Sequence, residues 1–201
     1  TSFAVSGTIP VIIVLIALDS TTATVSSVAV SAGLTSGTPV EVKTQRDGTG
    51  YGSIWAIPAP SWTGTITVTL SASVPWQSNA VLFAGADQTP PCPAADAASA
   101  PSNGTTNISV TCANLTADDA SCGLGANASD GDSPNWDQTD TFANNTTTVN
   151  MAAGYGLGTG ASSCTWGIAG QDIAVVAVRI AAAAAGGANP KGQCLTLLGV
   201  G

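Results

Sequence analysis

The chemistry open to this chain is limited first by the side chains that it lacks. It has no His, and its four basic residues are Lys43, Arg46, Arg179 and Lys191. Nucleophilic catalysis by Ser or Cys requires a neighbouring base, usually His, and no Lys lies in a motif that replaces it. Most of the 12 acidic residues fall in turns, where the local hydrogen bonding of Asp explains them, so a catalytic carboxylate pair is not indicated. We expect no enzymatic activity and no cofactor.

Five cysteines carry the most reactive side chains of the chain: Cys92, Cys112, Cys122, Cys164 and Cys194. Their spacing differs from the close paired spacing of zinc sites, so disulfide bonds formed in an oxidising compartment are the better prediction. Cys112 and Cys122 flank a predicted hairpin, and we expect them to form a disulfide bond. By closing the loop between them, this bond should stabilise the folded protein by about 3 kcal/mol. Because the number of cysteines is odd, at least one thiol per chain stays free in a head-to-tail polymer.

Two further patterns concern modification and metal binding. Six Asn-x-Ser/Thr sequons are glycosylation candidates, although a chain rich in Asn and Thr also produces sequons by chance; they begin at Asn103, Asn107, Asn114, Asn127, Asn144 and Asn145. Asp130 and Asp132 open a loop rich in carboxylate and amide oxygens, as calcium loops are. No Glu closes that loop and Pro134 departs from the usual pattern, so a solvated acidic loop is the simpler interpretation and no metal site is predicted.

Tryptophan side chains provide the remaining candidate binding groups, since a surface row of them stacks on sugars in carbohydrate-binding modules. The chain has five: Trp55, Trp62, Trp76, Trp136 and Trp166. Core packing is the alternative for each of them. Trp62 and Trp76 flank one predicted strand at opposite ends, so these two are not expected to form a single platform.

Composition limits the partners and the location of the protein. Only 8% of the residues are charged and the net charge is −8, so no basic patch is present to neutralise phosphates and nucleic acid is not an expected partner. The longest apolar run, residues 11–18, is shorter than the roughly 20 residues that cross a bilayer, and no signal peptide is seen. Since the sequence starts at Thr1 and has several cysteines, we expect a processed, secreted protein at the cell surface.

Hydrophobic periodicity predicts strands throughout. In residues 62–90, Ile66, Val68 and Leu70 alternate with Thr, which places apolar side chains on one face of a strand. Residues 11–18 and 174–180 are apolar at nearly every position, as strands covered on both faces are. A change of phase at Ser26 and Ser27 predicts a β-bulge. No helical period with caps appears, so the chain is predicted to be all-β.

The expected fold is an antiparallel two-sheet β-sandwich, similar to a jelly roll, that forms one domain over residues 1–180. Residues 181–201 are expected to add a spacer and a C-terminal strand. Residues 181–190 are rich in Ala and Gly and have no period, whereas residues 193–200 alternate imperfectly.

Several stretches in order resemble a widespread family of uncharacterised secreted β-sandwich domains in prokaryotic surface proteins. Residues 54–58 (Ile-Trp-Ala-Ile-Pro), the Thr-rich strand at 65–70 and residues 82–88 occupy the places of the three motifs of that family, and the likeness covers residues 10–180. The resemblance implies a β-sandwich on a surface protein and no catalytic residues. The chain departs from the family pattern in its tail, residues 181–201, and in its five cysteines.

These observations favour an extracellular structural subunit that assembles with copies of itself into a pilus-like filament or a surface layer through exchange of a terminal strand. Strands that are apolar on both faces need a cover that a lone two-sheet sandwich does not provide. A terminal strand behind a structureless spacer is what donor-strand exchange requires. Two alternatives for the tail are that it folds back on its own domain or that residues 1–6 are exchanged instead. The alternative function is a secreted adhesin or carbohydrate-binding module with glycans as partners.

Overall fold

A computed structural model describes most of the chain, namely residues 2–5, 10–31, 37–58, 62–102, 107–127, 135–136, 140–145, 149–157, 162–165, 172–183 and 191–195. Within these residues the chain forms sixteen strands and a single 3₁₀ turn, η1 (Ala94–Asp96), so the prediction of an all-β fold is confirmed. No helix in the described part of the chain is long and apolar enough to span a membrane.

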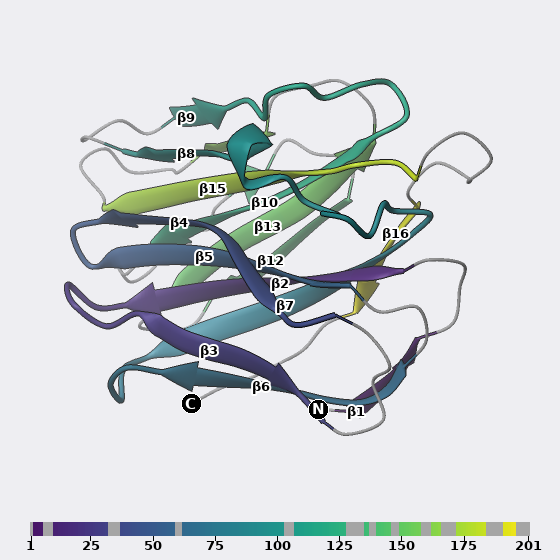
Figure 1. Cartoon of the computed structure of the whole chain (residues 1–201). Helices are drawn as coiled ribbons and strands as arrows, with labels where there is room; N and C mark the ends of the chain where they lie inside the picture. Colours follow the sequence, from purple (N-terminus) through teal and green to yellow (C-terminus); the bar gives the residue numbers. More distant parts are fainter. Residues whose placement is uncertain are drawn as a thin grey trace.

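The strands form four antiparallel sheets (Figure 1). Sheet 1 has the order β16 (Lys191–Leu195), β7 (Trp76–Ala84), β2 (Val11–Asp19), β5 (Gly50–Pro58) and β4 (Val40–Asp47). Sheet 2 has the order β12 (Asp140–Asn145), β13 (Asn150–Leu157), β10 (Ala120–Asn127), β15 (Ile173–Ile180) and β8 (Ala98–Pro101). Sheet 3 contains β1 (Ser2–Val5), β6 (Trp62–Leu70) and β3 (Val25–Val30), and sheet 4 contains β11 (Asn135–Trp136), β14 (Ser162–Thr165) and β9 (Asn107–Val110).

Three apolar cores separate these sheets. The largest lies between sheets 1 and 2, where Leu15 of β2 and Val176 of β15 are fully buried. A second core lies between sheets 1 and 3 and receives Ile16, the next residue of β2. The third lies between sheets 2 and 4 and receives Val175, the neighbour of Val176 on β15. The layers therefore follow the order sheet 3, sheet 1, sheet 2, sheet 4.

This layering corrects the expectation of a sandwich with only two sheets. Successive residues of β2 and β15 enter different cores because side chains alternate across a strand. Both faces of these strands are thus covered within the chain: sheets 2 and 3 cover β2, and sheets 1 and 4 cover β15. The inference that a neighbouring subunit must bury these apolar faces is wrong. The residue pattern of a strand shows that both faces are buried, but it does not show which segment buries them.

A prediction from the local sequence pattern is confirmed, whereas a prediction of which strands pair is wrong. The predicted bulge is confirmed, since the register of β3 against β6 shifts between Val25 and Ser27. The hairpin predicted between residues 106 and 126 is wrong, because β9 pairs with β14 while β10 lies between β13 and β15. The consecutive strands β6 and β7 also belong to different sheets.

Sheets 1 and 2 approach each other closely along β5. A Cβ atom on Gly50 would lie 2.6 Å from the backbone oxygen of Asp172, and one on Gly52 would lie 2.8 Å from Cδ1 of Leu124. Real Cβ atoms essentially never approach other atoms so closely, so Gly50, which faces backbone oxygen, requires glycine, whereas at Gly52 the end of the Leu124 side chain would have to shift. At the edge of the two sheets, the Ser102 hydroxyl donates a hydrogen bond to the Asp47 carboxylate at 2.6 Å, which ties the segment after β8 to β4.

Candidate functional site

The C-terminal segment first meets the rest of the domain directly after β15. The Asp87 N–H donates to the Ala181 carbonyl at 2.8 Å, and the Ala183 N–H donates to the Gly85 carbonyl at 3.0 Å. An isolated antiparallel bridge joins Ala182 to Ala86 between these two bonds. Residues 181–183, which the sequence suggested as the start of a structureless spacer, are therefore paired with the segment that continues β7.

The same segment meets β7 a second time through β16. These two strands pair antiparallel from Lys191 opposite Ala84 to Leu195 opposite Ala80, and β16 is the outermost strand of sheet 1 (Figure 1). We call the two sets of contacts, 181–183 with 85–87 and β16 with β7, the tail ladder. In this single chain the strand thus folds back on its own domain, which was one of the two alternatives for the tail.

The connection inside the tail ladder is much longer than its ends require. The partners of Gly85 and Ala84 are Ala183 and Lys191, and because neighbouring strands lie about 4.8 Å apart, these partners are at most about 10 Å from each other on any arrangement around β7. Residues 184–190 join them. A chain of that length spans about 26 to 29 Å when it is extended. The excess reach is therefore roughly 16 Å or more.

An ionic cluster anchors the start of the tail. Arg179, near the end of β15, donates through Nη1 to Asp96 Oδ2 at 2.7 Å and through Nε to Asp119 Oδ2 at 2.9 Å. The other oxygen of Asp119 accepts the Ala182 N–H at 2.9 Å. The side chain of Asp119 is only 2% exposed. These contacts, which we call the Arg179 cluster, hold residue 182 in place while the chain continues towards β16.

Hydrogen bonding keeps the Arg179 cluster ionised. Bonds from Asn114 and Arg179 lower the pKa of Asp96. Burial alone would raise the pKa of Asp119, but the hydrogen bonds that it accepts from Arg179, Ala182 and Thr116 outweigh this effect and lower it. The hydrogen bond to Asp119 is the largest cause that raises the pKa of Arg179. Every charge is paired, and the described residues contain no group of three or more His, Cys, Asp or Glu that could hold a metal ion, so the cluster has the character of a structural anchor.

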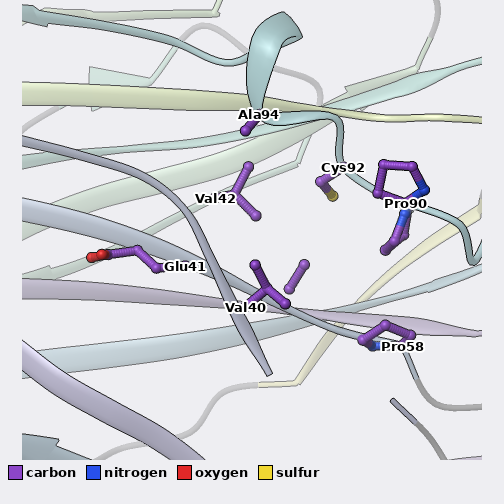
Figure 2. Close-up of a pocket in the computed structure, with 9 residues that line it drawn as sticks. Val40, Glu41, Val42, Pro58, Pro90, Cys92 and Ala94 are labelled. Atoms are coloured by element: carbon purple, nitrogen blue, oxygen red, sulfur yellow. The ribbon is translucent and has the colours of Figure 1, made fainter. Parts of the chain in front are cut away.

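A small apolar pocket lies between β4, β5 and the loop after β7 (Figure 2). Its volume is about 80 Å³, and its walls come from β4, β5 and the loop after β7: Val40, Glu41, Val42, Ala56, Pro58, Pro90, Pro91, Cys92 and Ala94. Val40, which is 56% exposed, is the only exposed large apolar residue among those the structure describes. Ligand sites for small molecules typically measure about 300 to 1,000 Å³, so this pocket suits a single aliphatic side chain.

The structure contradicts the predicted disulfide bond. Cys112 and Cys122 are both buried and are not bonded to each other. Cys122 lies in the core between sheets 1 and 2, whereas Cys112 lies in the core between sheets 2 and 4. Sheet 2 therefore separates the two residues that we expected to pair. Cys164 and Cys194 lie on β14 and β16, and their side chains are outside the described part of the structure.

The predicted glycosylation and calcium residues are not brought together. Asn127 is 0% exposed, so a glycan on it does not fit this fold, and the exposed Asn114 uses its Nδ2 to donate to Asp96 Oδ1 at 2.6 Å. Three other sequon residues lie on β9 and β12 with side chains outside the description: Asn107, Asn144 and Asn145. Asn103 and the calcium candidates Asp130 and Asp132 lie outside the described residues altogether.

The tryptophans that the structure describes pack into the protein. Trp55 and Trp76 are partly buried against the core between sheets 1 and 3, and the Trp55 indole N–H donates to the Ser53 hydroxyl at 3.0 Å. These two side chains therefore have the core role that was the alternative to sugar stacking. Trp62, Trp136 and Trp166 have side chains outside the description.

Sequence reasoning missed the Arg179 cluster, whose three ionised residues lie far apart in the chain. The available signal was a single Arg in the otherwise apolar strand at residues 173–180. Comparison with known proteins adds no further site, because no protein-family model, curated protein or solved structure matches this chain. The resemblance to surface-protein domains stays a prediction, and the functional inference rests on the geometry of the chain itself.

Proposed function

We propose that this chain is an extracellular structural subunit that assembles with copies of itself into a filament or surface layer by exchanging its C-terminal strand. The observation that supports this proposal is the excess length of residues 184–190 in the tail ladder. Pairing within one chain must bridge at most about 10 Å, whereas these residues reach about 26 to 29 Å. That length allows β16 to leave its own β7 and pair with the β7 of a neighbouring subunit.

Exchange preserves the contacts of the single chain. When β16 leaves, residues 80–84 of β7 become an unpaired sheet edge, and such an edge is a template for another strand. A neighbour's tail can occupy it in the same register, with its Lys191 opposite Ala84. Swapping an identical element between subunits costs little because the same interactions form again. If each subunit donates to the next, the contacts are head-to-tail and an open filament results.

The Arg179 cluster separates the part of the tail that stays from the part that exchanges. Asp119 and the Pro91 carbonyl accept hydrogen bonds from Ala182 and Ala181, at 2.9 and 3.0 Å. These bonds keep residues 181–183 on their own subunit, so the exchanged element begins beyond Ala183. A fixed starting point and a fixed register together determine how far apart two neighbouring subunits can be.

Exchange of the N-terminal strand is the alternative route to the same assembly. β1 also lies at a sheet edge, where its four residues pair with β6. The excess connection that supports exchange of β16 favours the C-terminal strand. An adhesin or carbohydrate-binding module is the alternative function, and the described residues favour it less, because the pocket is small and apolar and Trp55 and Trp76 pack against a core.

Truncation of the tail tests the proposal. The native protein is first examined by size exclusion and negative-stain microscopy, where a stable monomer at every concentration would eliminate assembly. A chain that lacks residues 191–201 is expected to form no filaments, to aggregate through the exposed edge of β7, and to be rescued by an added peptide of residues 184–201. A matched variant that lacks residues 1–5 is expected to retain assembly. Filaments of the C-terminal truncation would refute the exchange of β16, and loss of filaments in the N-terminal variant alone would assign the exchange to β1.

A further inference from the structure

Strand β7 is longer than the part of it that the C-terminal strand covers. It runs from Trp76 to Ala84, but β16 pairs with it only from Ala80 to Ala84. On its other side, β2 pairs with it as far as Trp76. Among the strands that the structure describes, none lies beside residues 76–79 on the edge that β16 occupies. This part of the edge is therefore a template for further residues of an added strand.

A buried hydrogen-bond acceptor lies on this open part of β7. Asn79 is 2% exposed, and its Oδ1 accepts no hydrogen bond within the described part of the chain. Its neighbour on the opposite strand, Leu15, and the next residue but one on β7, Val81, both enter the core between sheets 1 and 2. The Asn79 amide faces the same core, because side chains alternate along a strand. A buried acceptor without a donor destabilises the fold, so Asn79 needs a partner.

The register of β16 identifies the residue that can supply this donor. Leu195 lies opposite Ala80 in the antiparallel ladder, so the next residue of the sequence, Thr196, falls opposite Asn79 when the ladder continues. Directly opposed residues lie on the same face of a sheet, with Cβ atoms about 4.5 to 5.5 Å apart. A Thr hydroxyl at this position is a donor within reach of Oδ1. The residues on either side of it, Leu195 and Leu197, have no side-chain donor.

We propose that Thr196 of a neighbouring subunit donates a hydrogen bond through its hydroxyl to Asn79 Oδ1, and that this pair sets the register of the exchanged strand. The inference rests on the proposed exchange of β16, which brings the tail of one subunit to the β7 of the next. In the correct register the buried acceptor has its donor. A slip by one residue puts Leu195 or Leu197 opposite Asn79 and turns every side chain of the tail strand to the other face. Oδ1 then stays unpaired, which disfavours the shifted register.

A double-mutant cycle on the full chain tests the pair. Thr196→Val removes the hydroxyl and keeps the shape of the side chain, Asn79→Leu removes the acceptor, and a third variant carries both changes. Sedimentation measures the concentration of free subunit that remains in equilibrium with filaments. Thr196→Val should raise this concentration on the order of tenfold, because it leaves a buried acceptor unpaired. In the Asn79→Leu background the same change should have an effect of less than about twofold.

The matched control is Thr196→Ser, which keeps the hydroxyl and is expected to assemble as the unmodified chain does. An effect of Thr196→Val that is equally large in both backgrounds would overturn the pair, because the hydroxyl would then act without Asn79. If Asn79→Leu does not fold, the comparison of Thr196→Val with Thr196→Ser decides, and equal assembly of these two variants overturns the pair. Failure of the proposed function has a different result: the unmodified chain itself forms no filaments at any concentration, and the pair between subunits is overturned with it.

Discussion

Shortening the connection in the tail ladder separates pairing within a chain from pairing between chains. Deletion of residues 185–188 leaves three residues between Ala183 and Lys191. Three residues give four Cα steps, which span about 13 to 14 Å when extended. That length still covers the separation of at most about 10 Å that β16 must bridge to reach its own β7. The reach towards a neighbouring subunit, in contrast, falls to about half of its original value.

The shortened variant is expected to be a folded monomer. Its free energy of unfolding should rise by about 0.7 kcal/mol, because a closed loop of three residues costs less entropy than one of seven. Urea denaturation measures this change, and size exclusion with negative-stain microscopy measures assembly. The matched control replaces residues 185–188 with four Gly or Ser residues, which keeps the length, and we expect it to assemble as the unmodified chain does.

The outcome that would refute this reasoning is a shortened variant that polymerises like the length-matched control. Assembly would then need no more reach than folding back does, and the excess length would have no part in it. A shortened variant that fails to fold would instead show that β16 needs the full connection within its own chain. The unfolding transition distinguishes this result from a folded monomer.

Three further predictions concern the stability of the fold. Arg179→Met should lower the free energy of unfolding by about 3 kcal/mol at neutral pH, because it leaves two carboxylates without their cation. The pKa of both carboxylates is lowered in the folded state. Urea denaturation should therefore show that this loss shrinks as the pH falls below the ordinary Asp value of 3.8. Gly50→Ala should lower the melting temperature much more than Gly37→Ala, since the added Cβ meets backbone oxygen at 2.6 Å in the first case and only a proline side chain at 3.3 Å in the second; equal shifts would contradict the close approach of sheets 1 and 2. Phe83→Ala should cost about 3 to 5 kcal/mol in chemical denaturation, because the ring is fully buried and meets Tyr155 edge to face at 5.5 Å, and a loss below about 1 kcal/mol would count against that core.

Local patterns in the sequence were sufficient for the type of structure and for several details of it. The alternation at Ile66, Val68 and Leu70 and the uniform apolar run at residues 11–18 predicted strands that the structure contains. The change of phase at Ser26 and Ser27 predicted the bulge in β3. These features depend on neighbours within about ten residues, because the two faces of a strand repeat every second residue. The sequence by itself therefore determined an all-β protein and which strands need a cover on both faces.

Only the tertiary structure decided which segments provide that cover. The residues of a strand show that both of its faces are apolar, but the segment that buries a face can lie anywhere in the chain. Two small sheets therefore cover the outer faces of β2 and β15, where we expected a neighbouring subunit. The same reason explains why Cys112 lies in the core between sheets 2 and 4 while Cys122 lies in the core between sheets 1 and 2. It also explains why Arg179 meets two carboxylates that no motif connects to it. Side-chain pattern is a property of a short segment, whereas pairing, layering and the length to spare in the tail are relations between segments that meet only when the whole chain folds.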